Sequence, residues 1–168
     1  GNFEGKSILN RPVSDEDIAA QYKLTVEELE ATMQENRERL LEERANRVHP
    51  SRDDKVQVSW NGLMISAMAI GFQATGECRY IEAGKNAGTF ILENMFQPDG
   101  RLLHSYKDGE AKHNAYLDDY GGLMNGLIDL YESTLDRKWL EVADELAETT
   151  VAQFWDEEGD AFFYTGID

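Results

Sequence analysis

The stretch from Val56 to Gly76 carries no charged residue, although 29% of the whole chain is charged. Its apolar side chains fall on more than one side of a helix, with Trp60 and Leu63 along one line and Ile65 and Phe72 along another. A helix that is apolar on all sides is expected to be buried on all sides. The stretch has too many small residues for a membrane span, which needs about 20 strongly apolar positions. We therefore expect the inner helix of a layered helical assembly.

From Lys55 onward the chain repeats itself with an offset of about 60 residues. Gly62-Leu63-Met64 recurs as Gly122-Leu123-Met124, and with an offset one residue shorter Tyr80-Ile81-Glu82 recurs as Trp139-Leu140-Glu141. Each unit has a weakly charged helix (60–74 and 117–133), an amphipathic helix (79–96 and 137–155), a glycine-containing turn and a short extended piece. A buried helix followed by a one-sided helix, repeated, predicts two concentric layers of helical hairpins. The predicted fold class is all-α.

The residues before the repeat predict a lead-in and two helices. Residues 1–13 are rich in turn-forming types and end in Arg-Pro, which is typical of extended chain. Ser14 with Asp17 predicts the start of a short helix that runs to about Tyr22. Thr25 with Glu28 is a stronger capping box, and it predicts a long helix towards residue 47. We interpret this helix as an outer helix or connector, with a partner-binding helix as the alternative.

Charge and cysteine content exclude several classes of protein. The net charge of −17 argues against binding to nucleic acid or to an anionic membrane, because both repel such a surface. The single cysteine, Cys78, excludes an internal disulfide and a thiolate metal cluster. No signal peptide or lipidation motif is visible, so a cytoplasmic location is expected. The chain does not begin with Met, and its abrupt start suggests a piece of a longer protein.

Several motifs in order resemble one family. They are Gly1-Asn2-Phe3-Glu4-Gly5, Asp54-Lys55-Val56, Trp60-Asn61-Gly62-Leu63-Met64 and Leu117-Asp118-Asp119-Tyr120. These motifs resemble the spermatogenesis-associated protein 20 family, and the match spans nearly the whole chain. The resemblance implies an N-terminal thioredoxin-like domain followed by a six-hairpin helical toroid, similar to N-acylglucosamine 2-epimerases and several glycoside hydrolases. This chain resembles a middle segment of that toroid.

The resemblance implies a domain organisation and a set of partners. Residues 1–168 would be a single domain fragment, with residues 1–54 as lead-in and N-terminal helices, 55–116 as hairpin unit one and 117–168 as hairpin unit two. The thioredoxin-like part is absent, and two hairpins cannot close a six-hairpin ring. The implied partners are a sugar or other small molecule and the rest of a longer chain. Self-association through exposed edges is also expected.

Parallel inner helices would bring their N-termini together at one mouth of the toroid. Asp118 and Asp119 lie at that mouth, and each is either a first-turn residue stabilised by the helix dipole or a general acid or base facing the cavity. Glycoside hydrolysis needs two carboxyl groups several Å apart, on opposite sides of the bond. Because adjacent helical residues point about 100° apart, these two do not form such a pair. A partner would come from Asp54, Asp108 or elsewhere.

An epimerase or isomerase would instead use a histidine, because a base that titrates near neutral pH suits proton abstraction beside a carbonyl. His113 is the first candidate by position and His104 the second, with a solvated loop residue as the alternative for each. Trp60 and Tyr120 are candidates for stacking on a sugar ring, with core packing as the alternative. Asn61 is a candidate ligand-binding group or a helix cap.

No metal constellation, phosphate-binding glycine loop or nucleophile elbow stands out, so no cofactor is expected. Two hypotheses for the function follow. The first is a carbohydrate-active enzyme domain, either an epimerase or a hydrolase. The second is a non-catalytic binding or scaffold domain that presents partners to a thioredoxin-like module. Whether the chain is an enzyme stays open, and the isolated segment is expected to be inactive under either hypothesis.

Overall fold

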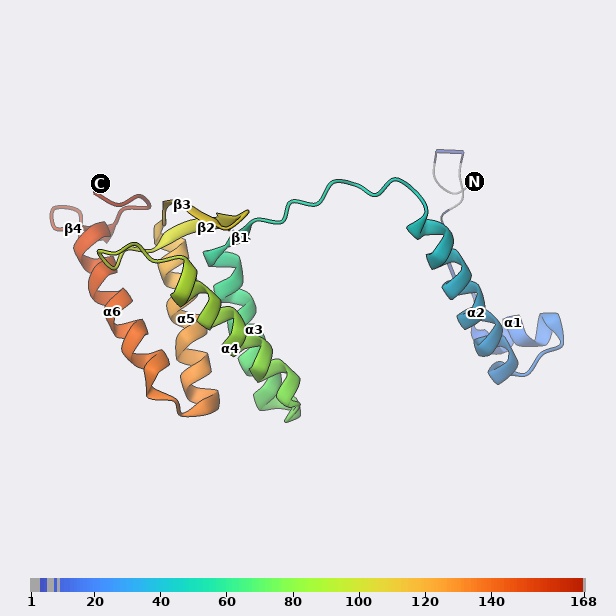
Figure 1. Cartoon of the computed structure of the whole chain (residues 1–168). Coiled ribbons are helices and arrows are strands. Elements are labelled where there is room, and N and C mark those ends of the chain that lie inside the picture. The colour runs from blue at the N-terminus through green and yellow to red at the C-terminus, as the bar shows by residue number, and fades with distance from the viewer. Residues whose placement is uncertain (1–3, 6–7, 9, 168) are drawn as a thin grey trace. The chain divides into compact units, whose positions relative to one another are not determined.

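The computed structural model describes residues 4–5, 8 and 10–167 (Figure 1). The chain divides into two compact units, Gly1–Arg52 and Asp53–Asp168, and each is described by itself. The division lies close to the predicted boundary after residue 54. The assignment of the whole chain to one domain stays a prediction. Part of the predicted extended lead-in, residues 1–3, 6–7 and 9, falls outside the described residues.

The first unit contains two helices that begin where the capping residues predict. Helix α1 spans Asp15–Tyr22, and the Ser14 side chain accepts a hydrogen bond from the backbone N–H of Asp17. Helix α2 spans Val26–Ala45 and opens with a complete capping box, in which Thr25 and Glu28 each bind the other's backbone N–H. Ala19 and Leu29 are the buried residues of these two helices.

The second unit contains the two predicted helical hairpins. Helices α3 (Val58–Thr75) and α4 (Cys78–Asn94) form the first hairpin, and helices α5 (Leu117–Thr134) and α6 (Arg137–Phe154) form the second. Gly76 ends α3 in a left-handed backbone conformation (φ 73°), which glycine adopts readily at the C-terminal end of a helix. The observed ends lie within about two residues of the predicted ones, a normal uncertainty for helix termini. The fold is all-α, built as part of a double-layered helical toroid.

Short strands join the helices. Strands β1 (Val56–Gln57), β2 (Leu103–Lys107) and β3 (Glu110–Asn114) form an antiparallel sheet in the order β1-β2-β3. β1 runs directly into α3, so the sheet lies at the N-terminal end of the inner helices (Figure 1). Strands β4 (Trp155–Asp156) and β5 (Ala161–Phe162) pair after α6. These are the extended pieces that the repeat predicts after each hairpin.

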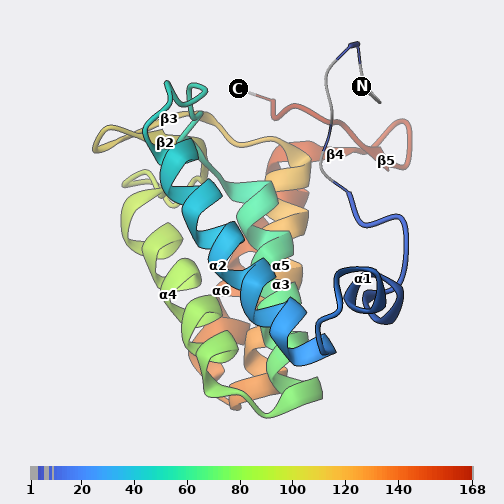
Figure 2. The ribbon, with the colours of Figure 1, turned by 90° about the vertical axis from the view of Figure 1, so that its right-hand side faces the viewer.

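Helices α3 and α5 run parallel and touch through their backbones. Three cross-links advance in the same direction along both helices, from Ser59–Asp119 through Ser66–Asp129 to Gln73–Ser133. A Cβ added to Gly62 would lie 2.3 Å from the backbone carbon of Gly122. Figure 2 shows α4 on one side of this pair. The parallel arrangement places both inner-helix N-termini at one end of the unit, as the sequence predicts.

The core of the second unit lies between the two hairpins. Its largest fully buried side chains include Trp139, Tyr120, Phe154, Ile65 and Ile91. The expectation that α3 is buried on all sides is wrong. Trp60, Leu63, Met64 and Ile70 are more than half exposed, because α3 packs on α5 and α4 and its remaining side faces away from both. In the described part of the chain, no helix is long and apolar enough to cross a membrane.

Candidate functional site

The Asp119 carboxylate joins three elements at the N-terminal end of the inner helices. Its side chain is fully buried. Oδ1 accepts a hydrogen bond of 2.9 Å from the backbone N–H of Ser59 at the start of α3. Oδ2 accepts one of 2.9 Å from the backbone N–H of Tyr116, which precedes α5, and one of 2.8 Å from the His104 ring on β2. These three donors satisfy the hydrogen-bonding capacity of a carboxylate that would otherwise be costly to bury.

The His104 ring is oriented by this carboxylate. Because Asp119 accepts at Nδ1, the neutral ring carries its proton there and keeps a lone pair on Nε2. The side-chain nitrogen of Gln57 lies 3.5 Å from Nε2, in a long contact. The His104 side chain keeps 21% of its surface exposed. A buried carboxylate that holds a histidine ring in place is an arrangement suited to proton transfer.

Two tyrosines lie beside this pair. The ring of Tyr116 packs edge-on against His104, with 5.2 Å between centroids. The Tyr116 ring also stacks on the Tyr164 ring, with 5.2 Å between centroids and nearly parallel planes. The segment after β5 is fixed here by a backbone hydrogen bond from Leu117 N–H to the Tyr164 carbonyl. Loss of hydration and a hydrogen bond to the Asp118 carboxylate raise the pKa of Tyr164 above its ordinary value. Asp118 itself is exposed.

The predicted binding residues of α3 and α5 have different surroundings. Trp60 is 71% exposed. Asn61 is half-buried, and its side-chain N–H₂ donates to the Gln57 carbonyl at 2.8 Å, which is a local helix contact. Tyr120 is buried, and its hydroxyl accepts a hydrogen bond of 3.1 Å from the backbone N–H of Leu102. Burial, opposed by that hydrogen bond, raises the pKa of Tyr120 above its ordinary value. Tyr120 therefore packs in the core, and its sugar-binding role stays a prediction.

His113 lies opposite His104 in the β2–β3 register, between the partners of Leu103 and Ser105. Its backbone is left-handed (φ 65°), which interrupts the ladder at this residue. The side chain lines a shallow cavity of about 230 Å³ with Ser105, Lys107 and other residues of the hairpin. His104 is not among the residues that line this cavity. The structure thus brings His104, not His113, to Asp119.

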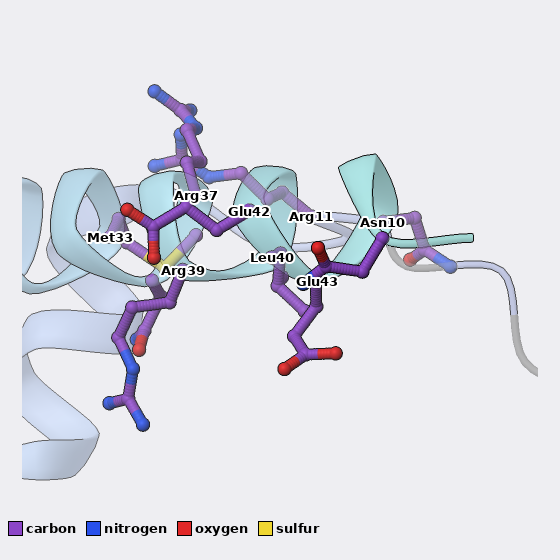
Figure 3. Close-up of a pocket in the computed structure, with 10 residues that line it drawn as sticks. Asn10, Arg11, Met33, Arg37, Arg39, Leu40, Glu42 and Glu43 are labelled. Carbon is purple, nitrogen blue, oxygen red and sulfur yellow. The ribbon is translucent and has the colours of Figure 1, made fainter.

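A larger hollow lies in the other unit (Figure 3). Its volume is about 810 Å³, and it is lined by α2 residues and by Asn10, Arg11 and Asn46. Figure 3 shows Arg37, Glu42 and Arg39 pointing in different directions around it. Its lining side chains are exposed, apart from half-buried Met33, and none of them is a buried polar group, so the candidate site is centred on Asp119. Across the described residues, no three His, Cys, Asp or Glu side chains are grouped to hold a metal ion.

The sequence has curated relatives. It is 33% identical to spermatogenesis-associated protein 20 of Homo sapiens over 172 residues, which cover 97% of this chain. It is 32% identical to the protein of the same name from Mus musculus, and 29% identical to an uncharacterized protein of Caenorhabditis elegans over 95% of the chain. No protein-family model matches. The chain is thus a relative of the spermatogenesis-associated protein 20 family. It spans about a fifth (22%) of the length of the human relative.

The fold of this spermatogenesis-associated protein 20 relative is also found in sugar enzymes. A GH76 alpha-mannanase from Bacteroides thetaiotaomicron matches 69% of this chain and 32% of its own, with a TM-score of 0.58 and 20% identity. A cellobiose 2-epimerase from Spirochaeta thermophila matches 66% of this chain and 28% of its own (TM-score 0.60, 15% identity). A D-mannose isomerase matches 65% and 30% (TM-score 0.60, 16% identity). At these identities the likeness shows the fold.

The sequence indicates Asp119 as a candidate, whose role stays a prediction, and it ranks His104 behind His113. It gives no reason to select Tyr116 or Tyr164. The fold-back of the β2–β3 hairpin, which pairs Leu103 with Asn114, carries His104 towards the start of α5. A hairpin between residues 103 and 114 could be inferred from the Asp108-Gly109 turn. Nothing in the sequence indicates that Tyr164 returns to α5.

Proposed function

We propose that this chain forms part of a carbohydrate-active domain of the epimerase, isomerase or glycosidase type. His104, oriented by Asp119, would be its acid–base group. The observation that carries the proposal is the 2.8 Å hydrogen bond between the half-buried His104 ring and the fully buried Asp119 carboxylate. The three named structural neighbours are an alpha-mannanase, a cellobiose 2-epimerase and a D-mannose isomerase, and a shared fold alone does not fix an activity.

The chemistry follows from the orientation of the ring. The lone pair on Nε2 would take a proton from a carbon beside a sugar carbonyl, and the carboxylate would stabilise the imidazolium that forms. Asp119 itself would be a positioning residue, since it has no exposed surface. Exposed Asp118, hydrogen-bonded to Tyr164, is the second proposed acid–base group. For glycoside hydrolysis Asp118 would need a further carboxylate, several Å away.

The remaining predicted residues keep proposed roles of lesser weight. Trp60 presents an exposed ring on which a sugar could stack, and Asn61 would bind a hydroxyl after releasing the Gln57 carbonyl. Tyr120 would act from the core by holding Leu102 and β2 in place. His113 would contribute only to a ligand that reaches the cavity of about 230 Å³ at the β2–β3 hairpin.

The wider proposal concerns a longer protein. The domain would be fused to a thioredoxin-like domain, as the family resemblance implies, and the present segment alone would not turn over substrate. A non-catalytic scaffold that presents partners to that module is the alternative. One observation favours it: Asp119 is fully occupied by two backbone N–H groups and His104, which is also what a structural carboxylate does.

The proposal is tested by recording the histidine ring signals of this chain by NMR while monosaccharides, disaccharides and amino sugars are added. The chain has three histidines, and His49 lies in the other unit, so it is an internal control. We expect one sugar class to shift the His104 signals and to leave His49 unmoved, and we expect His104→Gln to abolish binding of that sugar as measured by calorimetry. His49→Gln is the matched control and should bind normally. If no sugar shifts His104, the site is not a sugar site and the scaffold alternative takes its place.

A further inference from the structure

Tyr164 occupies in the second hairpin unit the place that His104 occupies in the first. In each unit the chain turns back after the outer helix, and the residue before the ring donates its backbone N–H to the carbonyl at the end of that helix. These hydrogen bonds run from Leu103 to Met95 and from Phe163 to Phe154, and each is 2.8 Å long. The next residue of each returning segment is therefore in an equivalent position: His104 after α4 and Tyr164 after α6.

The two equivalent rings lie at the same mouth. Figure 1 shows the β2–β3 hairpin and the segment that follows β4 at the same end of the unit. The rings of His104 and Tyr164 both contact the Tyr116 ring, each with 5.2 Å between centroids. The backbone of Tyr164 is held there by its carbonyl, which accepts a hydrogen bond of 3.0 Å from the Leu117 N–H. Tyr164 is 57% exposed, so a ligand at the mouth can reach it.

Each ring is hydrogen-bonded to a carboxylate in the first turn of α5. His104 binds the buried Asp119, and Tyr164 binds the exposed Asp118. Loss of hydration, and then the hydrogen bond and charge of Asp118, raise the pKa of Tyr164. The phenol therefore keeps its proton at neutral pH and donates it to Asp118. The phenol oxygen is then left with lone pairs that can accept a hydrogen bond from a ligand.

We propose that Tyr164 is the group through which Asp118 takes a proton from a sugar hydroxyl, an inference that rests on the proposed function. The Tyr164 oxygen takes the hydroxyl proton while its own proton passes to the Asp118 carboxylate. The O–H bond of the sugar breaks, the sugar oxygen keeps the electron pair, and the phenol is restored. Donation of the phenol proton to the sugar is opposed, because it would leave a phenolate beside the Asp118 carboxylate. The ligand is therefore a sugar that places a carbon beside its carbonyl at His104 and a hydroxyl at Tyr164.

The hydrogen bond between Tyr164 and Asp118 is tested first, without a ligand. Tyrosine that is isotope-labelled at Cζ reports the ionisation of each phenol by NMR, and Tyr164→Phe assigns the signal. Asp118→Asn should lower the pKa of Tyr164 towards its ordinary value, because the charge that holds the phenol proton is lost. Tyr120, whose pKa is raised by burial, is the internal control and should not respond. An unchanged pKa of Tyr164 in this variant would overturn the inference.

The hydroxyl contact is then tested by calorimetry, with the sugar that shifts the His104 signals and with its single-deoxy analogues. Tyr164→Phe keeps the ring that stacks on Tyr116 and loses only the hydroxyl, so it should bind the parent sugar roughly threefold to tenfold more weakly than the wild type. The analogue that lacks the hydroxyl facing Tyr164 should bind both chains equally. Tyr131→Phe, near the other end of α5, is the matched control and should bind as the wild type does.

The outcomes distinguish a failure of the Tyr164 role from a failure of the proposed function. A sugar that shifts the His104 signals but binds the wild type and Tyr164→Phe with equal affinity would overturn the Tyr164 role and leave the proposed function in place. If no sugar shifts the His104 signals, both are wrong. A His104 shift together with weaker binding by Tyr164→Phe, restored to equality by one deoxy analogue, supports both.

Discussion

At the scale of single residues, Asp119 is the side chain on which the end of the inner layer depends. Replacing it with Ala leaves the buried N–H of Ser59 and the N–H of Tyr116 without their acceptor. Each lost hydrogen bond to a carboxylate costs about 1–3 kcal/mol, so Asp119→Ala should lower the free energy of unfolding by about 3 kcal/mol. Urea unfolding followed by circular dichroism measures this change.

Asp118 is the matched control for that prediction. It is the same residue type, one position earlier in the same helix, but its side chain is exposed and hydrogen-bonded to Tyr164. Asp118→Ala should change the free energy of unfolding by about 0.5 kcal/mol or less. Equal losses for the two variants would show that Asp119 acts only through the helix dipole, which both residues share, and not through its hydrogen bonds.

The burial of Tyr120 predicts that the free energy of unfolding depends on pH in the alkaline range. Burial raises its pKa in the folded state above that of the unfolded chain, which is about 10. The folded state therefore holds the phenol proton more tightly, and its contribution to stability is complete below the unfolded pKa and is lost as pH rises towards the folded one. The wild type should lose stability more steeply above about pH 10 than Tyr120→Phe does.

The measurement is urea unfolding of both chains at a series of alkaline pH values. Tyr120→Phe should be less stable than the wild type near neutral pH, because the N–H of Leu102 loses its acceptor. The gap between the two should then narrow as pH rises. Parallel curves would mean that Tyr120 does not carry the alkaline effect and that another tyrosine, such as Tyr164, does.

These residues also show what a sequence can say about a site. The Asp118-Asp119 pair was visible at once, because two acidic residues open a weakly charged helix. Which of the two side chains is buried depends on where α3 packs against α5. Neighbouring residues of a helix point about 100° apart, so one of the two faces α3 and the other does not. Tyr164 reaches the mouth through one backbone hydrogen bond to Leu117, a contact between distant segments that has no local signature.

At the scale of elements, the seam between α3 and α5 depends on glycine. A Cβ on Gly62 would lie 2.3 Å from backbone atoms of Gly122, and backbone cannot turn aside as a flexible side chain can. The helices would have to move apart, so Gly62→Ala should destabilise the chain by about 2–3 kcal/mol through overpacking. Thermal unfolding measures the effect as a lower midpoint.

Two glycines of the same helices provide controls. Nothing lies within 4 Å of a Cβ built on Gly121, and Gly71 would meet only the Tyr80 ring at 3.6 Å, an ordinary contact distance. Alanine favours a helix over glycine by about 0.5–1 kcal/mol, so both Gly121→Ala and Gly71→Ala should stabilise the chain or leave it unchanged. A destabilised Gly121→Ala variant would contradict the close approach as the cause of the Gly62 effect.

Helix positions could be predicted well because local chemistry sets them. The Thr25–Glu28 capping box predicts the start of α2, and Gly76 ends α3 with the backbone that glycine favours. The exposure of the α3 side chains could not be predicted from the uncharged stretch Val56 to Gly76. An apolar helix is suited to burial, but its own residues do not show which neighbouring elements cover it. Helix α3 packs against α4 and α5, and its remaining side stays exposed.

At the scale of the whole molecule, the repeat predicted the toroid-like layering, because hairpins that recur at about 60 residues stack in one way. Gly62 and Gly122, which are equivalent positions of the repeat, lie in close backbone contact in the structure. The repeat does not predict what the Gly1–Arg52 unit does, because the repeat begins only at Lys55. Its helices bury only Ala19 and Leu29, so its sequence pattern fixes two capped helices and little else.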